Sequence, residues 1–235
     1  MKILGMDSSG LVAGVAVVED DVLLAEYTTN YKKTHSQTLL PMLDELRTMI
    51  ELDLNTIDAV AIASGPGSFT GLRIGSAAAK GLGLALGKPL VEVPTLEGLA
   101  WNMWGACELV CPLMDARRNQ VYGAAYEFIS EGEKFRLQTV IPQNPMNITE
   151  FVDKLNEIGR KAVFLGDGVP VYMPVIREHI KVPYHLAPAS ANRQRAACIA
   201  SLGAVYFAEG KTVSAAAHKP EYLRKSQAEQ VAKQL

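Results

Sequence analysis

Short apolar runs separated by polar and glycine-containing turns open the chain. The runs at residues 3–7, 12–18 and 22–28 have the length and the β-branched content of strands, and Ser/Gly and Asp-Asp turns lie between them. Residues 36–50 then place apolar side chains at helical spacing. Pro41 lies inside this stretch, and we expect it to kink the helix or to move its start toward the C-terminus.

Strand and helix signals alternate in the rest of the first hundred residues. A predicted strand at 58–63 runs into a glycine-rich loop, a helix at 71–86 follows, and a short strand occupies 90–93. Gly87 and Pro89 have the pattern of a helix end, with glycine in the left-handed position after the last turn. The predicted order of this part is β-β-β-α-β-α-β.

After residue 104 the same order of elements begins again. Two segments of equal length, 6–19 (MDSSGLVAGVAVVE) and 114–127 (MDARRNQVYGAAYE), share their first two residues, an alanine and the last glutamate. The repeated order of elements indicates an internal duplication. The predicted elements are strands at 109–114, 121–128 and 134–141, a helix at 148–159, a strand at 162–166, and helices at 170–180 and 191–209.

A three-strand meander followed by α-β-α, present twice, is the plan of the actin-like ATPase and sugar-kinase architecture. The sequence therefore predicts an α/β protein of the actin-like ATPase fold, with two ribonuclease-H-like βββαβα halves. The first half covers residues 1–104 and the second residues 105–235. We expect the apolar helix 191–209 to pack on the second half, while this helix or the tail after it can cross back to the first.

Composition and charge indicate to which class of protein the chain belongs. The 235 residues are 49% hydrophobic and 20% charged, as in a globular protein, and a net charge of −2 provides no global basic field for nucleic acid. Cys107, Cys111 and Cys198 are expected to be reduced core residues. The N-terminus begins a strand at once and no apolar run has the length of a membrane span, so we expect a cytoplasmic protein without a leader.

The glycine-rich segment SGPGSFTGLRIG at residues 64–75 follows a predicted strand and opens a helix. It does not fit a P-loop, because Leu82 stands where the first glycine should precede Gly87-Lys88, and Pro89 replaces the Ser/Thr. The dinucleotide fingerprint fails as well, since the glycines are spaced G-x-G-x-x-x-G. Neither nucleotide-binding motif is therefore present.

This segment can still place an anion at the start of the helix. Gly67 allows a tight turn, and Ser68 or Thr70 can cap the helix, whose free N–H groups attract negative charge. In the actin-like plan two hairpin turns also approach the ligand phosphates. The alternatives are a well-capped loop without a ligand, and turn aspartates that only accept turn hydrogen bonds. The candidate phosphate-binding residues are Asp7, Ser8, Gly67, Ser68, Thr70 and Asp115.

The helices at 36–50 and 71–86 carry more apolar surface than one sheet can cover. In the second helix leucine and isoleucine side chains surround the axis, while glycine and alanine keep it slim; in the first, Met42 and Met49 lie off the apolar stripe. This excess favours a subunit interface. The alternative is that the two helices cover each other.

Catalytic and metal-binding patterns are scarce. The four histidines form no H-x-x-x-H or H-E-x-x-H pair, and the sequence contains no G-x-S-x-G motif. His35 is expected to be solvated or hydrogen-bonded near a helix start. We therefore predict no catalytic residue, no metal ligand and no resident cofactor.

Several motifs together resemble those of a known family. They are ILGMDSS, THSQTLLPML, ASGPGSFTGLRIG, KPLVEVPTLEGLA, MDARRNQVY and KPEYLR, which occur in this order over nearly the whole chain. With them the chain resembles the TsaB (YeaZ) family, which takes part in forming N6-threonylcarbamoyladenosine beside the anticodon of tRNAs that read codons beginning with A. The resemblance implies an actin-like fold and a non-catalytic partner of TsaD, a paralogue that has a histidine-pair metal site. It also implies that ATP or ADP binds only weakly or within the complex.

The resemblance also implies partners. Members of the family bind TsaD through their N-terminal helices, the ATPase TsaE joins the complex, tRNA is reached through the complex, and the free proteins form homodimers through overlapping surfaces. Two alternatives stay open: an ATP-dependent phosphotransferase that uses Asp7, the loop 65–71 and Asp115, and a metallopeptidase. For this chain the predicted partner contacts are Leu40, Leu43, Arg73, Ile74, Ala77 and Leu84.

Overall fold

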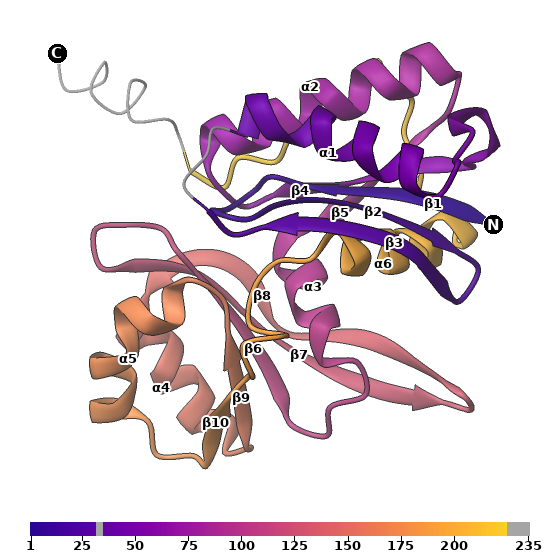
Figure 1. The fold of residues 1–235 in the computed structure, drawn as a ribbon. Coiled ribbons are helices and arrows are strands. Elements are labelled where there is room, and N and C mark those ends of the chain that lie inside the picture. Colours follow the sequence, from indigo (N-terminus) through magenta and orange to yellow (C-terminus); the bar gives the residue numbers. More distant parts are fainter. Residues whose placement is uncertain (32–34, 225–235) are drawn as a thin grey trace, which may run out of the picture.

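The computed structural model describes residues 1–31 and 35–224, and in these residues the chain forms two five-stranded sheets with helices between and around them (Figure 1). The first sheet contains β1 (Lys2–Asp7), β2 (Ala13–Glu19), β3 (Val22–Thr29), β4 (Ala59–Gly65) and β5 (Leu90–Pro94). The second contains β6 (Leu109–Asp115), β7 (Gln120–Glu131), β8 (Lys134–Asn147), β9 (Ala162–Leu165) and β10 (Tyr184–Leu186). The helices are α1 (His35–Met49), α2 (Phe69–Leu86), α3 (Thr95–Ala100), α4 (Ile148–Ile158), α5 (Gly168–His179) and α6 (Ala196–Ala208).

Both sheets have the same topology. The strand order is β3-β2-β1-β4-β5 in the first and, counted from the opposite edge, β8-β7-β6-β9-β10 in the second. In each sheet three antiparallel strands form a meander, and two further strands run parallel to the first strand of that meander. The duplication and the α/β actin-like plan predicted from the sequence are thus confirmed. The division of the chain at residue 104 stays a prediction.

Helices and sheets alternate in layers. Figure 1 shows α1 and α2 on the outer face of the first sheet, α3 and α6 between the two sheets, and α4 and α5 outside the second. Apolar side chains fill each space, with Leu39 under α1, Ile199 between the sheets and Phe151 under α4. Burial of these surfaces supplies the main favourable term in folding.

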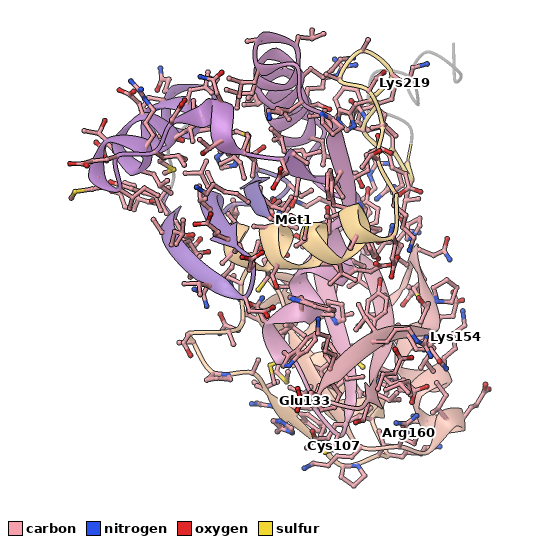
Figure 2. All side chains as sticks on the ribbon, turned by 90° about the vertical axis from the view of Figure 1, so that its right-hand side faces the viewer. Met1, Cys107, Glu133, Lys154, Arg160 and Lys219 are labelled. Carbon is pink, nitrogen blue, oxygen red and sulfur yellow. The ribbon has the colours of Figure 1, made fainter. Side chains whose placement is uncertain are left out.

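The last helix, α6, lies on the first sheet. It contacts β1, β2, β4 and β5, and a Cβ on Gly5 of β1 would lie only 2.5 Å from the Ala196 carbonyl oxygen. The α6 backbone therefore lies on the first half, the crossing that the sequence left open. Its side chains also meet the second half as expected, since Ile199 shares a core with Met114 and Tyr126. Side chains of α6 fill the layer between the sheets (Figure 2), which explains why the helix is apolar on most sides. The tail at 225–235 lies outside the described residues.

Several element ends differ from the predicted ones. α1 begins at His35 with Pro41 in its interior, so the proline does not move the start of the helix. α2 begins at Phe69, two residues earlier than predicted, because Ser68 caps it. Its end matches the prediction, with Gly87 in the left-handed conformation at φ 65°.

The three cysteines are free. Cys111 and Cys198 are buried, as predicted, but Cys107 is exposed, so its predicted place in the core is wrong. In Figure 2 it lies at the end of the second half, far from the first sheet.

Candidate functional site

The glycine-rich loop after β4 packs against the first hairpin turn. The Ser68 N–H donates a hydrogen bond to the Ser9 carbonyl oxygen at 2.6 Å, and Ser8 Oγ donates to the Gly71 carbonyl oxygen at 2.9 Å. A Cβ on Gly71 would lie 2.1 Å from the Ser8 carbonyl oxygen, and one on Gly67 would lie 2.4 Å from that of Ser9. The glycines therefore allow backbone-to-backbone contact between turn and loop. This contact brings the predicted residues Ser8, Gly67 and Ser68 together.

Asp7 is buried in the same turn. Its carboxylate accepts hydrogen bonds from the Ser9 N–H at 2.8 Å and from Ser9 Oγ at 2.7 Å, which are the turn bonds considered from the sequence. Burial raises the pKa of Asp7 to about 6, although the Ser9 hydrogen bonds and the charge of His35 oppose the rise. His35 Nε2 lies 2.8 Å from the Gly10 carbonyl oxygen, so His35 is hydrogen-bonded near a helix start, as predicted. Phosphate binding at this turn stays a prediction.

Asp115 occupies the corresponding turn of the second half. Its carboxylate accepts hydrogen bonds from the Arg117 N–H at 2.8 Å and from the Tyr172 hydroxyl at 2.9 Å, and it forms an ion pair with the Arg117 guanidinium at 3.2 Å. Arg117, Arg118 and Asn119 have φ values of 63°, 56° and 57°. A run of left-handed residues other than glycine is strained, and the contacts of Asp115 support it.

Residues 213–224, which we call the C-terminal strap, cover the glycine-rich loop. The strap begins with an antiparallel bridge to Leu90 at the edge of β5, and its Glu221 N–H donates to the Ser64 carbonyl oxygen at 2.7 Å. Gly65 has φ 132°, and a Cβ there would lie 2.3 Å from the Glu221 carbonyl oxygen. The C-terminal strap therefore lies against the glycine-rich loop, which we predicted from the sequence as a phosphate-binding site.

The end of the strap connects the two halves. The Tyr222 ring lies 4.6 Å from the Phe69 ring, and the Arg73 guanidinium lies 4.0 Å above Phe69 while donating to the Tyr222 hydroxyl at 3.3 Å. Arg224 Nη1 donates to the Ala116 carbonyl oxygen at 2.6 Å. The strap thus ties the start of α2 to the second hairpin turn. Sequence periodicity gave no sign of it.

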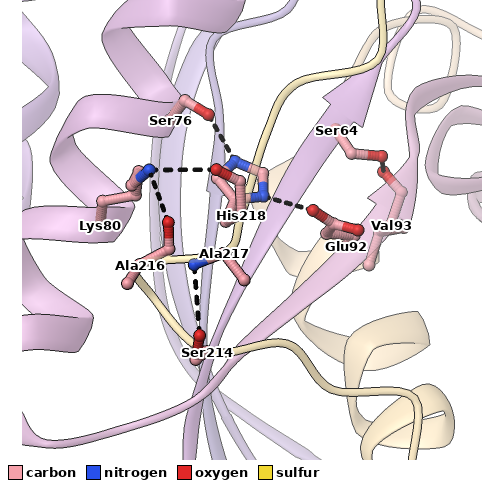
Figure 3. Close-up of polar contacts among 9 residues, drawn as sticks. All are labelled: Ser64, Ser76, Lys80, Glu92, Val93, Ser214, Ala216, Ala217 and His218. Carbon is pink, nitrogen blue, oxygen red and sulfur yellow. Dashed lines mark hydrogen bonds and ion pairs between the residues drawn. The ribbon is translucent and has the colours of Figure 1, made fainter.

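Three side chains, one each from the strap, α2 and β5, have the order of a hydrolase triad. His218 Nδ1 lies 2.6 Å from Glu92 Oε1, and its Nε2 contacts Ser76 Oγ (Figure 3). However, Ser76 is 5% and His218 1% exposed, so a substrate carbonyl has no path to the serine. Ser76 also lies inside α2, whose backbone N–H groups bond within the helix and do not form an oxyanion hole.

This buried group fastens the strap to α2 and β5. Lys80 Nζ adds hydrogen bonds to the carbonyl oxygens of Ala216 and His218, at 3.2 and 3.1 Å (Figure 3). Ser76 and His218 are 142 residues apart in sequence, so no local sequence motif predicts their contact. We interpret the group as a structural clasp.

The outer faces of α1 and α2 expose apolar and small side chains. Leu40 is 50%, Leu84 64% and Met49 84% exposed, and Arg73 and Ala77 are exposed beside them. The two helices contact each other, yet these side chains stay uncovered. Mutual packing of the helices therefore does not account for this surface.

The predicted partner contacts differ in accessibility. Ile74 is half-buried against the core of the first half, and Leu43 is 3% exposed and belongs to that core. Met42, which the sequence places off the apolar stripe, is buried with it. The Leu43 side chain is almost fully buried and cannot contact a partner, so we leave it out of the candidate interface. The predicted contacts that reach the surface are Leu40, Arg73, Ala77 and Leu84.

The described ranges contain neither a metal-binding cluster nor a membrane-spanning helix. Within residues 1–31 and 35–224, no three His, Cys, Asp or Glu side chains gather as a metal ion requires. Among the helices of the same ranges, none is both long and apolar enough to cross a membrane.

The chain matches known proteins over most of its length. The family described as TsaD: tRNA N6-adenosine threonylcarbamoyltransferase matches residues 22–231. The chain is 31% identical over 229 residues to the tRNA threonylcarbamoyladenosine biosynthesis protein TsaB of Bacillus subtilis, covering 97% of this chain and 96% of that protein. It is 31% identical over 230 residues to TsaB of Escherichia coli, covering 95% of each.

Solved structures agree in fold. Two structures from Pseudomonas aeruginosa, described as YeaZ and as a protein with similarity to peptidase YEAZ, superpose with TM-scores of 0.75 and 0.79 at 26% identity. They cover 94% and 95% of this chain and 99% of their own. A polyphosphate/ATP-glucomannokinase from Arthrobacter has a TM-score of 0.50 at 12% identity, covering 89% of this chain and 99% of its own, and shares the fold alone.

Proposed function

This chain belongs to the TsaB (YeaZ) family, within the wider TsaD-type family, and from that premise we propose that it acts in threonylcarbamoyladenosine biosynthesis as a docking subunit. It binds the catalytic paralogue TsaD through α1 and α2, and TsaE joins the pair. The chain itself carries no catalytic residue, and tRNA is reached through the complex in the cytoplasm.

The observation that carries the proposal is the exposed face of α1 and α2. Leu40 and Leu84 together leave two large apolar side chains in water, and full burial of a leucine contributes about 2 kcal/mol. Ala77, Gly81 and Leu84 follow one another at spacings of four and three along α2, and a Cβ on Gly81 would meet no heavy atom within 4 Å. A partner helix can therefore approach the α2 backbone closely and cover the two leucines.

The non-catalytic role is supported by the positions of the groups that resemble active sites. The glycine-rich loop donates its Ser68 N–H to the chain's own first turn and lies under the strap. Ser76 and His218 are buried in the clasp. The glycine-rich loop and the Ser76–His218 pair therefore make contacts that stabilise the fold.

The same face offers a homodimer contact when the chain is alone. A second copy and TsaD would then compete for Leu40 and Leu84. We propose no resident cofactor, and ATP or ADP binds weakly or within the complex. ATP hydrolysis by the isolated chain at roughly 1 s⁻¹ or faster would instead favour the phosphotransferase alternative.

A reconstituted modification reaction tests the proposal. Unmodified tRNA, TsaD, TsaE and the threonylcarbamoyl-adenylate synthase are incubated with the wild-type chain, with Leu84→Glu, or without the chain. Leu84 is preferred to the half-buried Ile74, because a glutamate at Ile74 would disturb the core as well. Val171→Glu is the matched control, since Val171 is an apolar residue on α5 that is 53% exposed.

Product is expected with the wild-type chain and with Val171→Glu, and at least tenfold less with Leu84→Glu. Equal product in the absence of the chain would contradict a docking subunit.

A further inference from the structure

The edges of the two sheets differ in how well they are shielded. An open edge presents unpaired N–H and C=O groups that invite another strand, so proteins cover it, shorten it or place charges and prolines on it. β5 is covered by the strap at Leu90, and β10 has only three residues. β8 carries Lys134 and Arg136 together with Pro142 and Pro145. Three of the four edges in the described residues are therefore protected.

β3 is the unshielded edge. It has eight residues, VLLAEYTT, without lysine, arginine or proline, and within the described ranges it pairs only with β2. Val22, Leu23 and Tyr27 are 59%, 45% and 42% exposed. A register shift interrupts the β2–β3 pairing near Leu24, but residues 25–29 pair regularly. Figure 1 shows β3 at the near edge of the first sheet, with α1 above it and no further strand beyond the edge.

An open groove of about 520 Å³ runs beside this edge, between β3 and the C-terminal half of α1. Tyr27 and Ala25 line it from the strand, and Asp44, Glu45 and Met49 line it from the helix. A hydrogen bond to Glu45 raises the pKa of Tyr27, which places the two side chains in contact across the groove. Met49, 84% exposed, provides an apolar wall.

The groove favours positive charge. Glu26 is paired with Arg195, and Asp44 is paired with Arg47 at 2.7 Å. Glu45 forms no ion pair with any residue in the described ranges, and the C-terminal end of α1 adds the negative end of its helix dipole. A lysine or arginine side chain that enters the groove would lie near the Glu45 carboxylate and near the negative end of the α1 dipole.

We propose that the β3 edge and this groove bind an extended, basic segment of a partner protein, which adds to the first sheet as a further strand. Main-chain hydrogen bonds to β3 would supply affinity, and every second side chain of the segment would face the groove. Its basic side chains reach Glu45, and its apolar ones pack on Tyr27 and Met49. This site goes beyond the proposed function, which uses the other exposed face of α1 and the outer face of α2.

A second copy of the chain fits this edge poorly. Two β3 strands paired about a twofold axis bring the two grooves side by side, so that Glu45 and the negative end of α1 in one copy face the same charges in the other. A basic segment meets the opposite charge and is therefore the occupant we assign.

Selection of phage-displayed random eight-residue peptides on the full chain tests this site. Enriched peptides are expected to carry both lysine or arginine and valine, isoleucine or aromatic residues within one alternating set of positions, the set that faces the groove. A selected peptide should bind wild type at least tenfold more tightly than Glu45→Lys or Tyr27→Lys. Asp153→Lys, which changes an exposed carboxylate on α4, is the matched control and should bind as wild type does.

Hydrogen exchange then locates the peptide. The expected result is slower exchange at residues 22–29 and unchanged exchange in β5 and β8. Enrichment of acidic peptides, equal affinity for Glu45→Lys, or protection at another edge would overturn the proposal. So would a dimer of the free chain that Tyr27→Lys dissociates in sedimentation, because the edge would then belong to a second copy. Circular dichroism confirms that the variants, changed at exposed positions, keep the fold.

Discussion

At the scale of single residues, Asp7 links the stability of the fold to pH. Burial keeps a proton on its carboxyl up to about pH 6 in the folded chain, whereas an unfolded aspartate loses it near pH 4. Between these values the folded state binds more protons than the unfolded state. The contribution of Asp7 to the free energy of unfolding therefore falls as pH rises through this window, by about 3 kcal/mol.

The first prediction concerns Asp7→Asn. The amide keeps an oxygen that accepts the Ser9 hydrogen bonds and removes the buried charge. The free energy of unfolding of the variant, relative to wild type, should increase by about 2–3 kcal/mol between pH 4.5 and pH 7.5. Urea unfolding at both pH values measures it, with Asp153→Asn as an exposed control. A difference that does not change with pH would show that Asp7 is ionised in the folded chain at little cost.

The second prediction separates a clasp from a hydrolase. Ser76→Ala removes one hydrogen bond to His218 in the buried group, so the free energy of unfolding should fall by about 1–2 kcal/mol. Exchange of the strap amides should quicken as its anchor weakens. Hydrolysis of an activated ester such as p-nitrophenyl acetate should stay at the background rate in wild type and variant alike. Turnover by wild type that the variant loses would contradict the clasp.

At the scale of elements, the strap depends on the conformation of Gly65. The third prediction is that Gly65→Ala lowers the free energy of unfolding by about 2–4 kcal/mol and exposes residues 213–224 to proteases, because its Cβ meets the Glu221 carbonyl oxygen. Gly87→Ala is the matched control: φ is also positive there, but a Cβ meets nothing within 4 Å. It should cost only about 1 kcal/mol. Equal effects of the two changes would mean that the strap is not held at this point.

The order of the elements was predictable from the sequence because it depends on local periodicity. Ser68 and Gly87 mark the ends of α2 through capping that involves neighbouring residues only. The side on which α6 packs was not predictable, since a helix that is apolar nearly all round does not indicate which sheet it covers. The strap escaped prediction for a related reason: its anchors, such as His218 on Ser76, are contacts between residues far apart in sequence.

At the scale of the whole molecule, the two halves have the same topology but differ in how much apolar surface their outer helices leave exposed. In the second half α4 and α5 cover their sheet, and Val171 is their one large apolar side chain exposed in the described residues. In the first half α1 and α2 leave Leu40 and Leu84 uncovered on their shared outer face. The strap, through Arg224 and Tyr222, joins the two halves beside that face. The duplication thus gives both halves the same fold, and the first half carries the exposed apolar face that we propose as the docking surface.

The accessibility of the candidate interface residues was predictable in part. Excess apolar content identified α1 and α2, but it did not distinguish Leu43 from Leu40, and both were predicted as partner contacts. Leu43 faces the core because the sheet lies on that side of α1, and the sequence does not state where the sheet lies. Accessibility of each side chain is a property of the packed molecule.

The measurement that tests the central claim most directly is the affinity of this chain for purified TsaD. Calorimetric titration compares wild type, Leu40→Glu, Leu84→Glu and the control Val171→Glu on α5. The account predicts that each glutamate on α1 or α2 weakens binding at least tenfold, because burying an unpaired charge adds to the loss of apolar contact. The control should bind as wild type does. Unchanged affinity of both Leu40→Glu and Leu84→Glu, with the fold intact, would contradict docking through this face.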